Sequence, residues 1–301
     1  MQNHRISRRQ FIERTAAIAG GVMLSPLAAQ TTKRTAADQV PLGKTGLKVS
    51  RLSIGCGTSS GNVQKQLGVD GFNRLVRYAY DQGVTTIDVA SSYQTHEMIR
   101  DAIKDLPRER LFLQTKMGGV PENPLAEIDK YRKTYGVDYI DSLLVHCTIA
   151  PNWEEERKKV MDAMQEAKEK KIILAHGVSC HSLPALKRSA ELDWVDVQLV
   201  RVNPQGASMD TPRFDTWNAE SNETHVPAVV EQIKLMREKG RGVIGMKIMG
   251  EGRFTKPEDR EKSVRFAMQP GLLDCVTIGF KSTAEIDEAI QRINAALAEV
   301  A

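Results

Sequence analysis

The run Ile172-Ile173-Leu174 lies between two segments of helical period, 153–170 and 183–191, and it decides the fold. All three side chains are apolar, so both faces of a strand formed here are suited to burial. Such strands occur in parallel sheets covered by helices, whereas a half-exposed antiparallel strand alternates apolar and polar residues. The segment therefore predicts one repeat of a parallel α/β fold.

The same alternation of short aliphatic runs and longer helical segments occurs about eight times from residue 49 onward. Strands are predicted over 49–55, 85–89, 111–115, 142–145, 172–178, 195–200, 242–246 and 275–278. Helices are predicted over 71–82, 96–105, 125–135, 153–170, 183–191, 226–239, 257–268 and 284–298. Eight such units predict an α/β fold of the (β/α)8 TIM barrel type. A doubly wound sheet is the alternative, and it is disfavoured because no G-x-G-x-x-G follows the first strand.

The start of the chain has the order of a twin-arginine export signal. Arg8-Arg9 precede a weakly apolar stretch over 16–24 and a small-residue segment that ends at Ala28-Ala29. A spanning helix needs about 20 apolar residues, so we expect no stable membrane anchor here. A disordered basic tail in a cytosolic protein is the alternative. The predicted domains are a signal peptide over 1–29, a linker over 30–40 and the barrel over 41–301.

The export signal predicts a periplasmic or otherwise exported protein whose transport partner is the twin-arginine machinery. It also accounts for most of the formal net charge of +4, because its four arginines against one glutamate contribute three of those charges. The body of the chain is therefore nearly neutral, without the basic stripe that nucleic acid or an anionic membrane requires. We expect a small-molecule partner and no nucleic acid.

Reactive side chains follow three consecutive predicted strands. Asp88 and Tyr93 come at and after the end of the second, Lys116 at the end of the third and His146 at the end of the fourth. In a TIM barrel the active site lies at the carboxyl ends of the strands. These four side chains are therefore expected to converge on one mouth of the barrel.

The chain resembles the aldo-keto reductase family from Pro41-Leu42-Gly43-Lys44-Thr45-Gly46-Leu47-Lys48-Val49-Ser50 to the last helix. The stretch Tyr139-Ile140-Asp141-Ser142-Leu143-Leu144-Val145-His146 carries the resemblance at the fourth strand. The resemblance implies an NAD(P)H-dependent oxidoreductase that reduces aldehydes or ketones to alcohols by hydride transfer. It also implies a catalytic tetrad, namely Asp88, Tyr93, Lys116 and His146.

Carbonyl reduction explains why these residue types are needed. Hydride delivered to a carbonyl carbon leaves an alkoxide, which must gain a proton, and Tyr93 is the predicted donor. A nearby Lys116 ammonium is expected to lower the pKa of the phenol from its ordinary value of ~10. Asp88 is expected to hold Lys116 by an ion pair, and His146 to orient the carbonyl oxygen with a hydrogen bond.

The resemblance further implies where the nicotinamide cofactor binds, which is at strand ends and in the loops after strands seven and eight. The residues expected to contact it are Gly57, Thr58, Ser179, Gln198, Lys247, Gly250, Lys281 and Ser282. Ser282-Thr283-Ala284-Glu285 also has the pattern of a helix capping box, and the two interpretations are compatible. Lys281 favours NADP(H), while the Glu285 carboxylate would repel a 2′-phosphate and keeps NAD(H) possible.

Two other functions stay open. The export signal is consistent with an exported barrel that binds cofactor with little turnover. His146-Cys147 and Cys180-His181 offer soft ligands to zinc, so a metal-dependent barrel hydrolase using His146, Cys180 and His181 is conceivable. It is less favoured because neighbouring residues point to opposite faces of a strand. The four cysteines, Cys56, Cys147, Cys180 and Cys275, are expected to be reduced and mostly buried.

Overall fold

The computed structural model describes residues 33–300 of the 301-residue chain. Arg34–Ala301 form one compact unit. The predicted signal peptide, residues 1–29, lies outside the described residues. Within the described part, no helix combines the length and the apolar character needed to cross a membrane.

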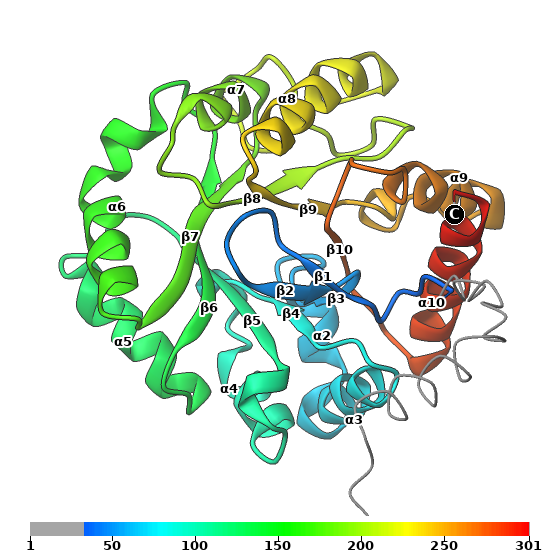
Figure 1. The fold of residues 1–301 in the computed structure, drawn as a ribbon, viewed down its shortest axis with the longest axis horizontal. Helices are drawn as coiled ribbons and strands as arrows, with labels where there is room; N and C mark the ends of the chain where they lie inside the picture. Colours follow the sequence, from blue (N-terminus) through cyan, green and yellow to red (C-terminus); the bar gives the residue numbers. More distant parts are fainter. Residues whose placement is uncertain (1–32, 301) are drawn as a thin grey trace, which may run out of the picture. The chain divides into compact units, whose positions relative to one another are not determined.

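Eight parallel strands close into a barrel in the order β10-β3-β4-β5-β6-β7-β8-β9 (Figure 1). Their bounds are β3 (Leu52–Gly55), β4 (Thr86–Asp88), β5 (Phe112–Met117), β6 (Ile140–Thr148), β7 (Ile173–Cys180), β8 (Val197–Arg201), β9 (Gly242–Met246) and β10 (Cys275–Ile278). The closed barrel confirms the predicted TIM fold and shows that the doubly wound alternative is wrong.

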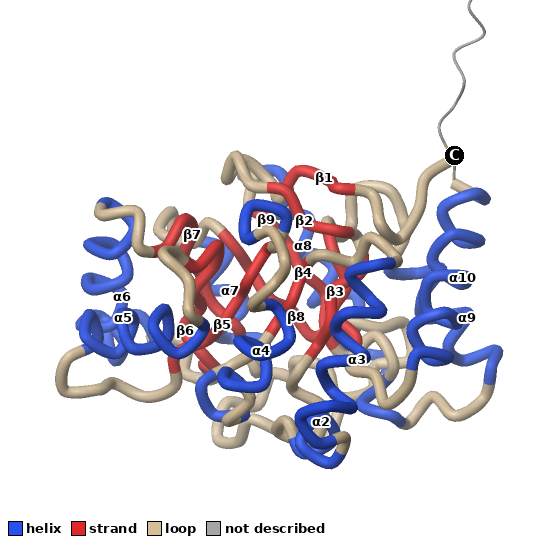
Figure 2. The backbone as a smooth tube through the Cα atoms, turned by 90° about the horizontal axis from the view of Figure 1, so that it is seen from below, coloured by secondary structure: helices blue, strands red, loops and turns tan. Residues whose placement is uncertain are grey.

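Helices surround the barrel and cover the outer faces of its strands (Figures 1 and 2). They are α2 (Asn62–Gln66), α3 (Gly68–Asp81), α4 (His96–Ile103), α5 (Pro124–Tyr135), α6 (Trp153–Glu169), α7 (Leu183–Glu191), α8 (Val226–Glu238), α9 (Pro257–Ala267) and α10 (Thr283–Glu299). Each of the eight predicted helices is present, with ends that differ by a few residues. The short helix α2 was not predicted.

An antiparallel hairpin of β1 (Gln39–Pro41) and β2 (Lys48–Ser50) lies across the amino-terminal end of the barrel (Figure 2). The sequence predicts one strand over 49–55, whereas the structure divides this segment at Arg51. The Ser50 side chain explains the break, because its hydroxyl donates to Leu52 O at 2.6 Å and accepts the Thr85 and Thr86 amides at 3.1 Å. A side chain thus replaces the strand ladder where the chain turns.

The linker predicted over 30–40 is also corrected by the structure. Residues 34–40 belong to the barrel unit, since Ala36 is fully buried and Gln39–Pro41 forms β1. The Ala36 amide donates to Asn294 Oδ1 at 2.8 Å, which attaches this segment to α10. The barrel therefore begins several residues earlier than its apolar periodicity indicates.

Apolar side chains fill the amino-terminal half of the barrel interior. Leu42 and Val49, which flank the hairpin turn, pack there with interior residues such as Phe112, Leu144 and Leu199. Farther along the same strands the inward-facing residues become polar, with Asp88 on β4 and Lys116 on β5. This change from apolar to polar places reactive groups at the carboxyl ends of the strands.

Candidate active site

A buried ion pair joins the ends of β4 and β5. Lys116 Nζ lies 2.7 Å from Asp88 Oδ1, and the two side chains are only 1% and 7% exposed. The ammonium also donates to Val89 O at 2.7 Å, while Gln114 Nε2 donates to Asp88 Oδ1 at 2.8 Å. Each charge therefore has hydrogen-bond partners, which is the condition for keeping charged groups inside a protein.

Tyr93 lies beside this pair, at the end of the 3-10 helix Ser91–Tyr93 that follows β4. Lys116 Nζ is 5.3 Å from the centroid of the Tyr93 ring. On another side the phenol contacts Gly57, where an added Cβ would lie 2.7 Å from Tyr93 Oη. The phenol therefore depends on a position without a side chain, which explains why a glycine stands here.

His146 completes the group at the end of β6. Pairing between β6 and β7 changes register between Val145 and Thr148, and Cys147 has a left-handed φ of 57°. Bulges of this kind redirect side chains near active sites. The His146 ring meets the Tyr93 ring edge-on, with centroids 5.7 Å apart and an interplanar angle of 87°. The structure thus brings Asp88, Tyr93, Lys116 and His146 together, as the strand order predicts.

Burial determines the ionisation of the two rings. It lowers the pKa of His146 to about 3, with further contributions from the positive charges of Lys116 and Lys247, so the imidazole is neutral at neutral pH. Burial also raises the pKa of Tyr93, and the Asp88 charge raises it further. This direction is opposite to the predicted lowering by Lys116, because burial disfavours the charged phenolate and the Asp88 charge adds to that effect. The phenol is consequently neutral and suited to donating a proton.

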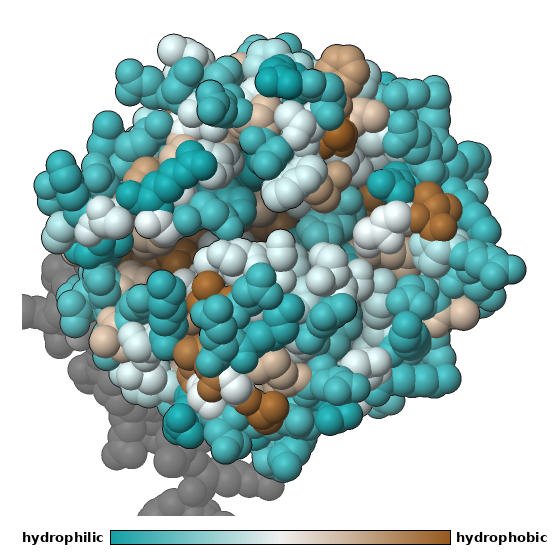
Figure 3. Space-filling view, turned by 180° about the vertical axis from the view of Figure 1, so that it is seen from behind, coloured by the Kyte–Doolittle hydropathy of each residue, from teal (hydrophilic) through white to brown (hydrophobic). Residues whose placement is uncertain are grey.

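A cavity of about 610 Å³ opens beside Tyr93. Figure 3 shows a hollow near the centre of the face opposite the hairpin. Four of the eight predicted cofactor residues line this cavity, namely Gly57, Thr58, Lys247 and Lys281. Asp88 and Tyr93 also line it, so the cavity connects directly to the ion pair.

The other four predicted cofactor residues lie elsewhere. Gln198 is fully buried and does not line the cavity; its amide oxygen accepts from Ser189 of α7 and its amide nitrogen donates to Leu199 O at 3.1 Å. Ser282 caps α10 by accepting from the Glu285 amide at 3.3 Å, and Gly250 packs against Phe254. Ser179 Oγ is buried without a hydrogen-bond partner among residues 33–300.

The sequence does not single out several residues at the far end of the cavity. Arg260 of α9 and Arg292 of α10 line it, and both donate to Glu288 Oε1, at 2.7 and 2.8 Å. Nearer the mouth, Glu251 forms an ion pair with Lys247. Helical periodicity could place Arg260 and Arg292 on helices, but their meeting depends on how α9 and α10 pack together.

The zinc alternative gains no support from the described residues. Within residues 33–300, no group of three or more His, Cys, Asp or Glu side chains could hold a metal ion. Cys180 is buried in the layer between strands and helices, where Thr148 Oγ1 donates to its sulfur at 3.5 Å. All four cysteines are free, and Cys56, Cys180 and Cys275 are buried as expected.

Comparison with known proteins agrees with this geometry. The aldo/keto reductase family model matches residues 53–301. A soybean (Glycine max) protein named "Probable aldo-keto reductase 1" is 27% identical over 236 residues, which are 71% of this chain and 60% of that protein. The NADH-specific methylglyoxal reductase of Escherichia coli is 25% identical over 171 residues, which are 47% of this chain and 51% of that protein.

A solved structure shares the fold. The holo form of an aldo-keto reductase from Bacillus halodurans has a TM-score of 0.66 at 16% identity, covering 88% of this chain and 96% of that one. The alignments with the two curated relatives span only 60% and 51% of their lengths. The family model nevertheless matches most of the barrel, from β3 to the end of the chain. The chain therefore belongs to the aldo/keto reductase family.

Proposed function

We propose that this protein is an NAD(P)H-dependent oxidoreductase that reduces aldehydes or ketones to alcohols. One observation carries the proposal: the buried Asp88–Lys116 pair lies beside Tyr93 and His146 at the edge of a cavity large enough for a ligand. A volume of about 610 Å³ falls within the range typical of ligand pockets. Membership of the aldo/keto reductase family supports a nicotinamide cofactor for this cavity.

The cavity residues fit such a cofactor. Gly57 and Gly279 both line the cavity, and each lets its backbone come close to a neighbouring side chain, since a Cβ on Gly279 would lie 2.0 Å from Thr58 Oγ1. Lys281 directly precedes Ser282, the N-cap of α10, where the positive end of the helix dipole favours phosphate. We therefore assign cofactor binding to Gly57, Thr58, Lys247 and Lys281, which line the cavity.

Reduced nicotinamide supplies hydride to the carbonyl carbon when it is bound. The residues of this chain then orient the carbonyl oxygen and protonate it. His146 is neutral, so its imidazole N–H donates a hydrogen bond that orients the carbonyl oxygen. Tyr93 transfers the proton of its Oη to the same oxygen as negative charge develops there. Lys116, held by Asp88, stabilises the phenolate that this transfer leaves behind.

The direct test is to mix the full chain with NADPH, or separately NADH, and a simple aldehyde such as benzaldehyde, and to follow loss of the reduced cofactor's absorbance. We expect oxidation of the cofactor with formation of one alcohol for each cofactor consumed. Tight binding without oxidation across a panel of aldehydes and ketones would instead favour the exported binding barrel with little turnover. Failure to bind either cofactor would remove the redox assignment.

The first prediction concerns Gly57. In Gly57→Ala the new Cβ would overlap Tyr93 Oη, so the phenol must move from its position beside His146 and Lys116. Displacement of a catalytic group by about 1 Å can cost ~100-fold in rate, and we expect a loss of kcat of that order. Gly118→Ala is the matched control, because nothing lies within 4 Å of its added Cβ. Comparable kcat values for the two variants would contradict the assigned position of Tyr93.

The second prediction concerns cofactor preference. We propose that Lys281 favours NADP(H), although Glu285 lines the same cavity and keeps NAD(H) possible. Lys281→Ala should lower kcat/KM for NADPH by about tenfold while changing that for NADH much less, since a lost charged hydrogen bond has this magnitude. Lys262→Ala, an exposed lysine of α9, is the control. Equal losses with both cofactors would show that Lys281 does not contact the 2′-phosphate.

The third prediction concerns export. We propose that residues 1–29 direct the protein through the twin-arginine route to the periplasm or outside the cell. In a bacterium that has this route, Arg8→Lys combined with Arg9→Lys should keep the protein in the cytoplasm, as measured by cell fractionation. Arg14→Lys should leave export intact, because it lies outside the arginine pair. Unchanged export of the double variant would overturn the signal.

A further inference from the structure

Four aromatic rings form a row across the mouth of the barrel. Beyond Tyr93 and His146, the His181 ring lies 6.4 Å from His146 between centroids, and the Trp217 ring lies 6.2 Å from His181. His181 follows β7, whereas Trp217 belongs to the long loop between β8 and α8. The row therefore leads from the proposed proton donor to a flat side chain on a different segment of the chain.

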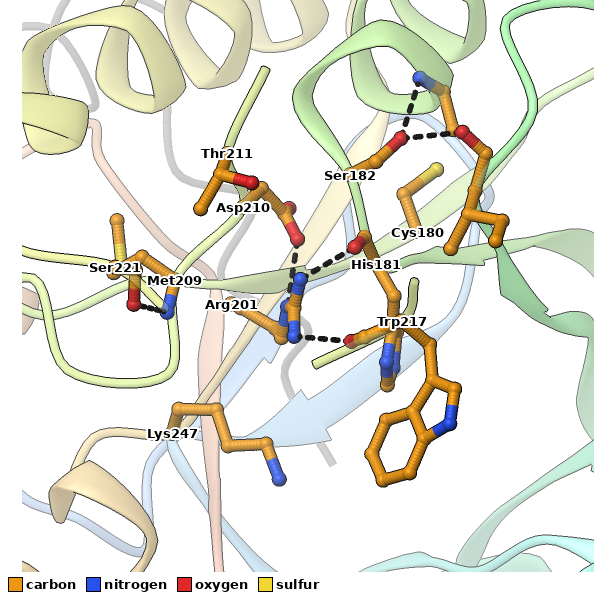
Figure 4. A network of polar contacts seen from close by, with 12 residues as sticks. Cys180, His181, Ser182, Arg201, Met209, Asp210, Thr211, Trp217, Ser221 and Lys247 are labelled. Atoms are coloured by element: carbon orange, nitrogen blue, oxygen red, sulfur yellow. Dashed lines mark hydrogen bonds and ion pairs between the residues drawn. The ribbon is translucent and has the colours of Figure 1, made fainter. Parts of the chain in front are cut away.

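A buried ion pair holds the segments that carry His181 and Trp217 (Figure 4). Arg201 Nε donates to Asp210 Oδ1 at 2.6 Å, and the two side chains are 4% and 0% exposed. The same guanidinium donates to His181 O at 2.5 Å and to Trp217 O at 3.0 Å. One side chain thus holds the backbone on both sides of the His181–Trp217 contact.

The Trp217 indole itself is left uncovered, with 55% of the residue exposed. Large aromatic side chains gain most of their stabilisation by burial. Here the backbone of Trp217 is anchored by Arg201 and its indole lies next to the His181 ring, yet more than half of the residue stays exposed. This arrangement is suited to a ligand whose own flat face covers the ring.

The charges around the mouth indicate what kind of ligand this is. Lys116 pairs with Asp88, Lys247 with Glu251 and Arg201 with Asp210. Burial lowers the pKa of His181 well below its ordinary value, so this imidazole is neutral like that of His146. Each of these three cations has its own carboxylate, and a charged substrate bound beside them would lose water without gaining an unpaired ionic partner.

We infer that His181 and Trp217 form a subsite for the flat, uncharged body of an aromatic carbonyl substrate, with Arg201 as the residue that positions both. This subsite rests on the proposed reductase function, because the row of rings leads to Tyr93. Stacking or edge contact with the indole holds the aromatic body, while the carbonyl group reaches Tyr93 and His146. The contact acts on binding more than on the chemical step.

The test compares benzaldehyde with propanal in the full chain, using Trp217→Ala, Trp217→Phe and Phe214→Ala. Phe214 is the matched control, since it lies in the same loop and is 52% exposed. In Trp217→Ala the KM for benzaldehyde should rise about tenfold with kcat changed less than about threefold, which is the size of an aromatic contact. Propanal should be unaffected, Trp217→Phe should restore most of the benzaldehyde KM, and Phe214→Ala should resemble wild type.

Arg201 is tested by Arg201→Lys, which keeps a cation for Asp210 but cannot reach both carbonyl oxygens. It should raise the KM for benzaldehyde as Trp217→Ala does and leave that for propanal unchanged. For the wild type, 4-carboxybenzaldehyde should have a lower kcat/KM than benzaldehyde. Equal effects of Trp217→Ala on the two aldehydes, or none on either, would overturn the subsite even if reduction itself is robust.

A separate readout tells failure of the subsite from failure of the reductase function. Benzamide, an uncharged aromatic carbonyl compound, should quench indole fluorescence in the wild type and not in Trp217→Phe, while acetamide should quench neither. Quenching by benzamide in the absence of any turnover would support the subsite and reject the reductase. Identical responses of the wild type and Trp217→Phe to benzamide would reject the subsite.

Discussion

Tyr93→Phe should lower kcat/KM for aldehyde reduction by about 10²–10⁴-fold, the range typical of a lost general acid. The variant removes the Oη proton that we assign to the alkoxide, yet it keeps the ring that contacts His146 and Gly57. Binding of reduced cofactor should therefore change little. Steady-state kinetics with benzaldehyde measures the first effect, and fluorescence titration with NADPH measures the second.

Tyr139→Phe is the control for Tyr93→Phe. Tyr139 precedes β6 at the opposite end of the barrel, where its ring lies under the Arg108 guanidinium at 4.0 Å. Removing this hydroxyl should leave kcat/KM unchanged. If Tyr93→Phe kept activity within about threefold of the wild type, another group would have to supply the proton and the assigned role of Tyr93 would be wrong.

The barrel could be predicted from the sequence because its strands are buried on both faces and its helices are amphipathic. Runs such as Ile172-Ile173-Leu174 signal this directly, and the structure places β7 there. The ends of strands were harder to predict where side chains replace backbone pairing. Ser50 interrupts the first predicted strand, and the bulge at Cys147 lets β6 continue to Thr148, beyond its predicted end at 145.

The positions of the four reactive side chains could also be predicted, because consecutive strands of a barrel end at the same mouth. Their electrostatics could not, since the pKa of Tyr93 depends on how deeply the fold buries it. The same holds for contacts between distant segments. Arg201 and Trp217 are brought together by the folding of one long loop. Arg260 and Arg292 share the Glu288 carboxylate only because α9 packs beside α10.

Lys116→Met should destabilise the protein by about 3–5 kcal/mol, the usual cost of leaving one partner of a buried ion pair alone. Methionine fills a similar volume but offers no charge to Asp88, which is only 7% exposed as a side chain. Urea unfolding followed by circular dichroism measures the loss. Lys158→Met, which breaks the exposed Lys158–Asp162 pair of α6, should leave the unfolding midpoint almost unchanged.

The double variant Asp88→Asn with Lys116→Met separates the structural role of the pair from its role in the reaction. With both charges removed, no uncompensated charge remains, so most of the stability lost in Lys116→Met should return. The introduced amide oxygen would still accept from Gln114, which keeps the local hydrogen bond. Activity should not return, because no ammonium is left to stabilise a Tyr93 phenolate. A stable double variant with wild-type kcat would show that the pair serves folding alone; a stable and inactive one would show that this protein keeps a buried charge for the chemistry at Tyr93.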